Sequence, residues 1–248
     1  MQIALAAELL ANARHAVILS GAGISTPSGI PDFRSTDNGL WQKYNPFEVA
    51  SLTAFRVNTN HFFEWFRPLT KQIVEAKPNK AHFAVSELEK HGIIKSVITQ
   101  NIDNLHQKAG SKNVFEIHGT LNTMTCASCY TKFPSSQFLD SYLEKGKIPT
   151  CPRCQNILKP DAILFEEQLP KRVWQCIVQE INKSDLMMVI GSSLEVIPVA
   201  NLPYQIISND GKLIIINNEP TYIDSRADVV LHENVITALP AVLEKINL

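Results

Sequence analysis

Apolar residues along the chain fall into short continuous runs separated by stretches with helical spacing. The helical stretch at residues 3–14 has one apolar face, and 79–92 ends on Gly92, as helices often do. The residues on the face of the first stretch are Ile3, Ala6, Ala7, Leu10 and Ala13. Fully apolar runs of strand length, alternating with helices, are typical of a parallel sheet covered on both faces, so the pattern predicts an α/β fold. The runs predicted to be strands lie at residues 15–20, 96–99, 185–191, 212–217 and, more weakly, 229–232.

Two segments interrupt this alternation. Residues 38–76 are rich in phenylalanine and tryptophan with little strand character, which predicts a helical insertion with its own apolar cluster. Residues 121–159 hold four of the five cysteines and are expected to form a separate module. The predicted main domain is therefore assembled from the remaining residues, 1–37, 77–120 and 160–248.

Composition and charge exclude several classes of protein. Hydrophobic residues make up 45% and charged residues 19% of the 248, as in an ordinary globular protein. The formal net charge of −1 offers no overall basic field to draw the chain to nucleic acid or to an anionic membrane. The N-terminus lacks a basic region and carries Glu8 within its apolar stretch, and no apolar run reaches the length of a membrane span. We therefore expect a cytoplasmic protein, monomeric, without nucleic-acid or membrane partners.

The cysteines form two C-x2-C pairs separated by 21 residues. Two such knuckles can converge into the tetrahedral thiolate cage that Zn²⁺ prefers, and four thiolates leave no open position, so the ion would be structural. Two disulfides or a redox dithiol are the alternatives, but no secretory signal or thioredoxin-like context supports them. The predicted ligands are Cys126, Cys129, Cys151 and Cys154, whereas Cys176 is expected to be a buried core thiol.

Polar side chains follow the predicted strands where an open α/β sheet binds its ligands. The first such loop, "GAGIS", begins like a dinucleotide-binding turn but has Thr26 at the place of the third glycine. Each later loop by itself is compatible with ordinary turn chemistry, and a lone histidine is often structural. Together they could line one crevice, with Gln100, Asn101 and Asp103 after one strand, His118 in "EIHGT", Gly191, Ser192 and Ser193 after another, and Asn217, Asn218 and Glu219 after a third.

These motifs together resemble the sirtuins, the NAD-dependent protein lysine deacylases. "GAGIS", "GIPDFRS", "TQNIDNLH", "HG", the two C-x2-C pairs, "GSS" and "NNE" occur in the order found in that family, from about residue 15 to 235. The resemblance implies a Rossmann-like NAD-binding domain and a smaller domain built from the zinc-ribbon module and the helical insertion. It also implies a deacetylase that moves the acetyl group of acetyl-lysine to ADP-ribose and releases nicotinamide. A mono-ADP-ribosyltransferase is the alternative, because it breaks the same bond.

The resemblance also implies roles for individual residues. His118 would be the general base toward a ribose hydroxyl, and Asn101 would be the second catalytic residue, lying against the ribose and a bound water. Gly21 and Gly23 would let the backbone approach the pyrophosphate, where a side chain would collide. The residues expected to bind NAD, which is consumed, are Gly21, Ala22, Gly23, Thr26, Phe33, Arg34, Gln100, Asn101, Ile102, Asp103, Gly191, Ser192, Ser193, Asn217, Asn218, Glu219 and Val235.

The substrate implied by the resemblance is an acetylated protein or peptide that adds as a strand between residues 163–170 and 193–200. Glu166 stands where the family usually has glycine, so we expect some preference for basic flanking residues. Sirtuins that prefer succinyl or malonyl groups carry a tyrosine and an arginine where a gapless alignment places Phe63 and Phe66, and Arg67 should point to another helix face. The pocket should therefore accept uncharged acyl groups. The residues expected to contact the substrate are Phe33, Phe63, Phe66, Ile163, Phe165, Glu166 and Val196.

Overall fold

The computed structural model describes residues 1–35 and 39–246. Within them, the larger sheet has six parallel strands in the order β3-β2-β1-β7-β8-β9. The order reverses between β1 and β7, so the loops after these two strands open a crevice at the carboxyl edge of the sheet. The strands are β1 (Ala16–Ser20), β2 (Ile94–Thr99), β3 (Val114–Glu116), β7 (Leu186–Ile190), β8 (Lys212–Ile216) and β9 (Val229–Leu231).

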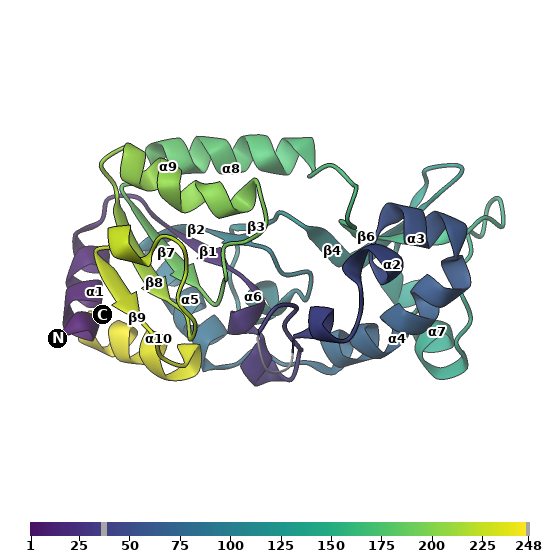
Figure 1. The fold of residues 1–248 in the computed structure, drawn as a ribbon, viewed down its shortest axis with the longest axis horizontal. Helices are drawn as coiled ribbons and strands as arrows, with labels where there is room; N and C mark the ends of the chain where they lie inside the picture. Colours follow the sequence, from purple (N-terminus) through teal and green to yellow (C-terminus); the bar gives the residue numbers. More distant parts are fainter. Residues whose placement is uncertain (36–38, 247–248) are drawn as a thin grey trace.

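Helices cover both faces of this sheet (Figure 1). Ile18, Met188 and Ile214 belong to the core cluster shared with α1 (Gln2–Asn12), α5 (Lys80–Lys90) and α10 (Val235–Lys245). Their strand neighbours Val17 and Met187 belong to the opposite cluster, shared with α8 (Lys171–Lys183) and α9 (Leu202–Ser208). Because successive strand residues point to opposite faces, uninterrupted apolar runs supply both cores at once.

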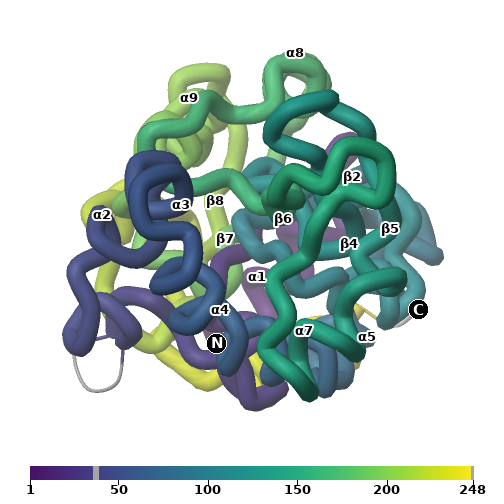
Figure 2. The backbone as a smooth tube through the Cα atoms, turned by 90° about the vertical axis from the view of Figure 1, so that its right-hand side faces the viewer, coloured from purple at the N-terminus to yellow at the C-terminus, as the bar shows by residue number. Residues whose placement is uncertain are grey.

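A smaller domain lies beyond the carboxyl edge of the large sheet (Figure 2). Its three-stranded sheet has the order β5-β4-β6, with antiparallel pairs between β4 (Gly119–Cys126) and both β5 (Lys132–Pro134) and β6 (Leu158–Ala162). Tyr142 joins the two parts of the domain, because its hydroxyl donates to the Phe63 carbonyl at 2.6 Å. The remaining helices are α2 (Pro46–Val49), α3 (Leu52–Val57), α4 (Thr59–Glu75) and α7 (Leu139–Lys145) in this domain, and α6 (Leu105–Lys108) after β2.

The α/β class, the five predicted strands and both predicted helices are confirmed. The short edge strand β3 was missed because its residues are only half-buried and do not form an apolar run. The prediction for Cys176 is wrong: this thiol is exposed, since α8 buries Ile177 and Ile181 on its opposite side. The exact domain boundaries stay predictions, and the one between residues 37 and 38 lies outside the described residues.

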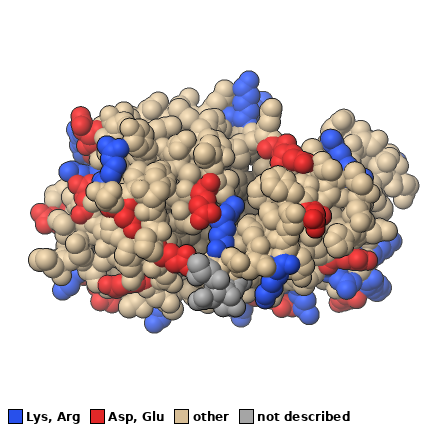
Figure 3. Space-filling model, viewed as in Figure 1, with Lys and Arg blue, Asp and Glu red and all other residues tan. Residues whose placement is uncertain are grey.

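Charged side chains of both signs are interspersed over the face drawn in Figure 3, without a broad patch of one sign. Among the described residues, no helix combines the length and the apolar character needed to cross a membrane.

Candidate functional site

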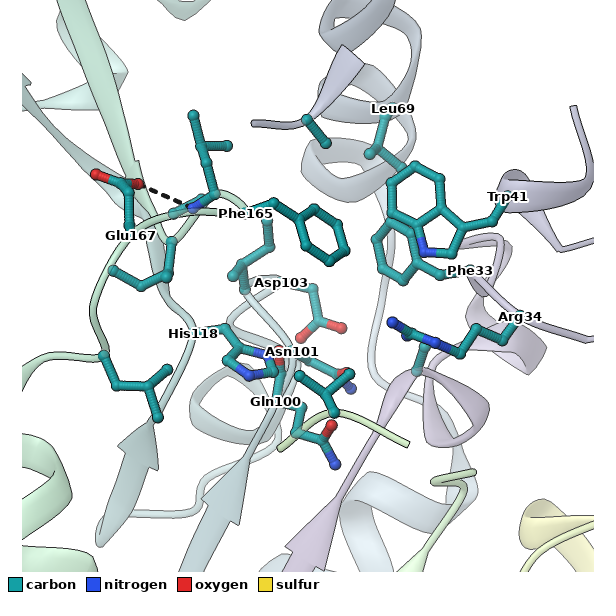
Figure 4. Close-up of a pocket in the computed structure, with 18 of the residues that line it drawn as sticks. Phe33, Arg34, Trp41, Leu69, Gln100, Asn101, Asp103, His118, Phe165 and Glu167 are labelled. Atoms are coloured by element: carbon teal, nitrogen blue, oxygen red, sulfur yellow. Dashed lines mark hydrogen bonds between the residues drawn. The ribbon is translucent and has the colours of Figure 1, made fainter. Parts of the chain in front are cut away.

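Two neighbouring cavities lie where the two domains meet. The larger has a volume of about 830 Å³ and runs from the loops after β1 and β2 to helix α4 and the segments 162–169 and 195–198. The smaller, about 200 Å³, lies over the loops after β1, β7 and β8. Asn101 and His118 line both cavities, and Figure 4 shows them below the aromatic side chains of the larger one. A ligand that spans both cavities would therefore have its middle part at His118.

His118 has its protonation state set by its surroundings. Its Nδ1 lies 3.1 Å from the Gln100 carbonyl oxygen, which can only accept, so Nδ1 carries the proton and the Nε2 lone pair stays available. The pKa of His118 is lowered to about 4, chiefly by burial; the bond to Gln100 raises the pKa and the positive charge of Arg34 lowers it. The imidazole is therefore neutral near pH 7, as a general base must be.

A buried hydrogen-bond chain orients Asn101 and Asp103. The Ser25 hydroxyl donates to Asp103 Oδ2 at 2.6 Å and accepts from Asn101 Nδ2 at 3.2 Å. The Asn79 backbone N–H donates to His82 Nδ1 at 3.3 Å, which leaves the proton on Nε2, 3.5 Å from the Ser25 oxygen. The hydrogen bonds from Asn79 through His82 and Ser25 thus all point toward the Asp103 carboxylate. Burial raises the pKa of this carboxylate. Asp103 is held as an acceptor at the floor of the larger cavity.

Ser25 and His82 were not identified from the sequence as site residues. His82 lies inside an ordinary helical pattern, and only its position three residues after Asn79, where the two form a capping box, distinguishes it. Further residues at the small cavity were also missed: Asp32 and Ser35 lie within the quoted motif "GIPDFRS", and Asn234 is the N-cap of α10. The missed lining residues are Asp32, Ser35 and Asn234.

The glycines after β1 are required by close contacts within the protein, and not only by the approach of a ligand that the sequence predicted. A Cβ on Gly21 would meet the Gly191 carbonyl oxygen at 2.7 Å, and one on Gly23 would meet the Gly191 Cα at 2.7 Å. Gly191 itself has a φ of +59°. Contact between the β1 and β7 loops therefore already requires glycine at these positions, before any ligand is considered.

The loop after Ile30 brings Phe33 and Arg34 over the site. Phe33 stacks on Trp41 with ring centroids 5.1 Å apart, which forms one wall of the larger cavity. Arg34 Nε lies 3.3 Å from a Glu195 carboxylate oxygen on the opposite side, and burial lowers the pKa of Arg34. The guanidinium thus sits between the two cavities with one carboxylate partner.

The structure brings every residue expected to bind NAD to one of the two cavities. Ile102 and Asp103 line the larger one. The pairs that hold the polar loops together include Gln100 Nε2 to Ser192 Oγ at 2.8 Å and Asn217 Nδ2 to the Glu219 carbonyl at 2.6 Å. The residues expected to bind NAD that line the smaller cavity are Gly21, Ala22, Gly23, Thr26, Phe33, Arg34, Gln100, Asn101, Gly191, Ser192, Ser193, Asn217, Asn218, Glu219 and Val235.

The four predicted zinc ligands converge at the end of the small domain. Cys126, Cys129, Cys151 and Cys154 place their sulfur atoms within 4.8 Å of one another. The Cys126–Cys154 and Cys129–Cys151 separations are 3.4 and 3.7 Å. Sulfurs at the vertices of a tetrahedron with Zn–S bonds of about 2.3 Å lie roughly 3.8 Å apart, so the donor set fits Zn²⁺.

Comparisons with known proteins decide the family. The Sir2 family model matches residues 21–198. The chain belongs to the Sir2 family. It is 44% identical to NAD-dependent protein deacylase 2 of Archaeoglobus fulgidus, covering 99% of this chain and 96% of that protein, and 46% identical to an NAD-dependent protein deacetylase of Caldivirga maquilingensis, covering 98% and 93%. A solved structure of Sir2 with a p53 peptide and NAD+ superposes with a TM-score of 0.90 at 36% identity, covering 99% and 98%.

In this Sir2 family member, helix α4 turns only one of the two aligned phenylalanines toward the large cavity. Phe66 lines it, together with Trp65, Leu69 and Ile73 of the same helix. Phe63 does not, because its ring packs against Phe55, Phe62 and Tyr142 inside the small domain. Arg67 is exposed, as the helical rotation predicts. The α4 side of the cavity is therefore apolar among the described residues.

Glu166, in the segment expected to bind the substrate, makes a contact that the sequence did not predict. Ile163, Phe165, Glu166 and Val196 all line the large cavity. The Glu166 backbone has φ +73°, the conformation that explains a glycine at this place. Its carboxylate accepts from the Thr53 backbone N–H at 2.9 Å, in the first turn of α3. The Thr53 side chain and this N–H lower the pKa of Glu166. The negative charge is thus engaged at the N-terminus of α3.

Proposed function

We propose that this chain is an NAD-dependent protein lysine deacetylase in which His118 is the general base. The observation that carries this proposal is the neutral His118, with its Nε2 lone pair available, at the point where the two cavities meet. Membership of the Sir2 family and the names of the relatives agree with it.

The polar cavity is proposed to bind NAD and the Asp103 region its carboxamide end. Bound NAD supplies an electrophilic ribose carbon with nicotinamide as the leaving group. The Asp103 carboxylate can accept from the carboxamide nitrogen, and Asn101 lies beside it through the shared Ser25 hydroxyl. Arg34 offers a fork of donors suited to phosphate oxygens. The Phe33 and Trp41 rings exclude water from the reacting end.

His118 is proposed to take a proton from a ribose hydroxyl on Nε2, which the fixed Nδ1 tautomer leaves free. The positive charge then formed on the imidazole is stabilised by the Gln100 carbonyl. The residues of 163–170 and 193–200 are proposed to bind the acetylated peptide as an added strand. That a Sir2 relative was solved with a p53 peptide supports a peptide substrate.

The acyl group is proposed to enter the apolar side of the large cavity beside Phe66, Leu69 and Ile73. Because the α4 side of this cavity is lined by apolar side chains, longer uncharged chains should also be accepted. A preference for basic flanking residues, a monomeric state, a cytoplasmic location and the lack of nucleic-acid or membrane partners stay predictions, and the binding of Glu166 to α3 weakens the first.

Mass spectrometry of an acetyl-lysine peptide incubated with and without NAD tests the function. We expect NAD-dependent loss of the acetyl group together with free nicotinamide and acetylated ADP-ribose. ADP-ribose attached to the peptide would instead support the transferase alternative. Reduced cofactor without nicotinamide release would overturn both. The unacetylated peptide is the matched control.

A further inference from the structure

A partly buried ion pair joins strand β6 to the proposed substrate segment, residues 163–170. Lys159 Nζ of β6 is 2.8 Å from a Glu167 carboxylate oxygen, and the two side chains are 16% and 20% exposed. Lys159 also donates to the carbonyls of Pro160 and Ala162, both at 2.9 Å. All three ammonium hydrogens therefore have acceptors, which a buried lysine requires.

The ion pair between Lys159 and Glu167 closes residues 159–167 into a small loop. The same Glu167 oxygen that faces Lys159 accepts from the Leu164 backbone N–H at 2.9 Å, the bond dashed in Figure 4. Lys159 thus holds the segment at Ala162, Glu167 holds it at Leu164, and the ion pair joins the two. These side-chain contacts constrain the backbone from 162 to 167 in addition to the backbone hydrogen bonds of Ile163, Phe165 and Glu167.

Residues 162–167 contact the residues of the candidate site through Ile163 and Phe165. The Ile163 N–H donates to the His118 carbonyl at 2.8 Å, and Phe165 pairs with the strand-like residues at Ser51. The Phe165 ring lies 5.9 Å from Trp41 and points into the cavity in Figure 4. A displacement of this loop would therefore move the edge on which a peptide strand adds, and the cavity wall with it.

We propose that Lys159 and Glu167 are positioning residues that hold residues 162–167 in the conformation that accepts the acylated peptide. This inference rests on the proposed function. We expect neither side chain to bind NAD, because Lys159 lines neither cavity and Glu167 lines only the large one, as part of the wall formed by residues 162–169. Loss of one charge leaves its partner partly buried without a counter-charge, which favours rearrangement of the loop toward water.

Steady-state kinetics of Lys159→Met test the proposal, with peptide and NAD varied separately. We expect the KM for acetylated peptide to rise about tenfold or more, since small displacements of a binding segment have effects of this size. The KM for NAD and the affinity for ADP-ribose should stay within about twofold of the wild-type values. This change is well below the tenfold change that corresponds to about 1.4 kcal/mol of binding free energy. Lys159→Arg, which keeps charge and donors, should restore most of the peptide KM.

Two further variants separate positioning from folding. Glu167→Gln keeps the acceptor for Leu164 while it removes the charge, and it carries the test if Lys159→Met does not fold. Lys132→Met is the control, because Lys132 pairs with Asp161 on the same small sheet and does not line either cavity. An unchanged peptide KM in a folded variant, or equal rises in both KM values, would overturn the proposal. Absence of wild-type turnover would instead overturn the proposed function.

Discussion

The acid sensitivity of the fold should depend measurably on His82. This side chain is fully buried, and burial lowers its pKa from 6.5 to about 4. Between these values the unfolded chain binds a proton that the folded protein does not, so stability falls as the pH falls through 6.5 toward 4. For one such group, lowering the pH from 7 to 5 costs about 1.9 kcal/mol of unfolding free energy.

The perturbation is His82→Gln, compared with wild type at both pH values. Glutamine is a favoured residue at this capping-box position and can accept the Asn79 N–H without titrating. The pH-dependent loss in the variant should be smaller than in wild type by about 1.9 kcal/mol, whatever the substitution costs at pH 7. His106 and His118, whose pKa values burial lowers to about 3 and about 4, remain in both proteins.

Urea unfolding followed by circular dichroism and by tryptophan fluorescence provides the measurement, and coincident transitions are the condition for a single free energy. Protonation of the zinc thiolates at pH 5 affects both proteins and cancels in the difference. His61→Gln, an exposed histidine on α4, is the matched control and should lose as much stability as wild type. Equal losses in wild type and His82→Gln would refute the reasoning, since the buried imidazole would then exchange no proton on unfolding.

Three further predictions concern activity. His118→Ala should keep its circular dichroism spectrum but lose roughly a hundredfold to ten-thousandfold in turnover, the range for a positioned base, and near-normal turnover would remove His118 from this role. Cys126→Ala, like chelation, should lose bound zinc and activity together, because structural zinc stabilises its module by about 10 kcal/mol or more; a metal-free, fully active variant would contradict this. Removal of succinyl should be at least about a hundredfold slower than removal of acetyl, because a buried carboxylate beside Phe66 would lack a partner; equal rates on matched peptides would show that a cation reaches it.

The order of strands along the chain and the chemistry of the metal site could be read from the sequence. Residues 213–216, within the predicted strand 212–217, are apolar at every position, a pattern typical of a strand buried on both faces. The C-x2-C knuckles carry their own geometry, because two thiolates three residues apart can share one ion. The polar residues after the strands were also predicted to meet, since parallel strands bring their carboxyl ends to one edge.

Only the tertiary structure decided which neighbours each side chain meets. Phe63 and Phe66 are equally apolar, and the packing of α7 on α4 determines that one enters the core and the other the cavity. Ser25 reaches Asp103 across 78 residues, and Gly23 lies against Gly191 across a longer separation still. Local pattern sets an element's type and its apolar face. Contacts between distant segments depend on the packing of whole elements, which no short stretch of sequence contains.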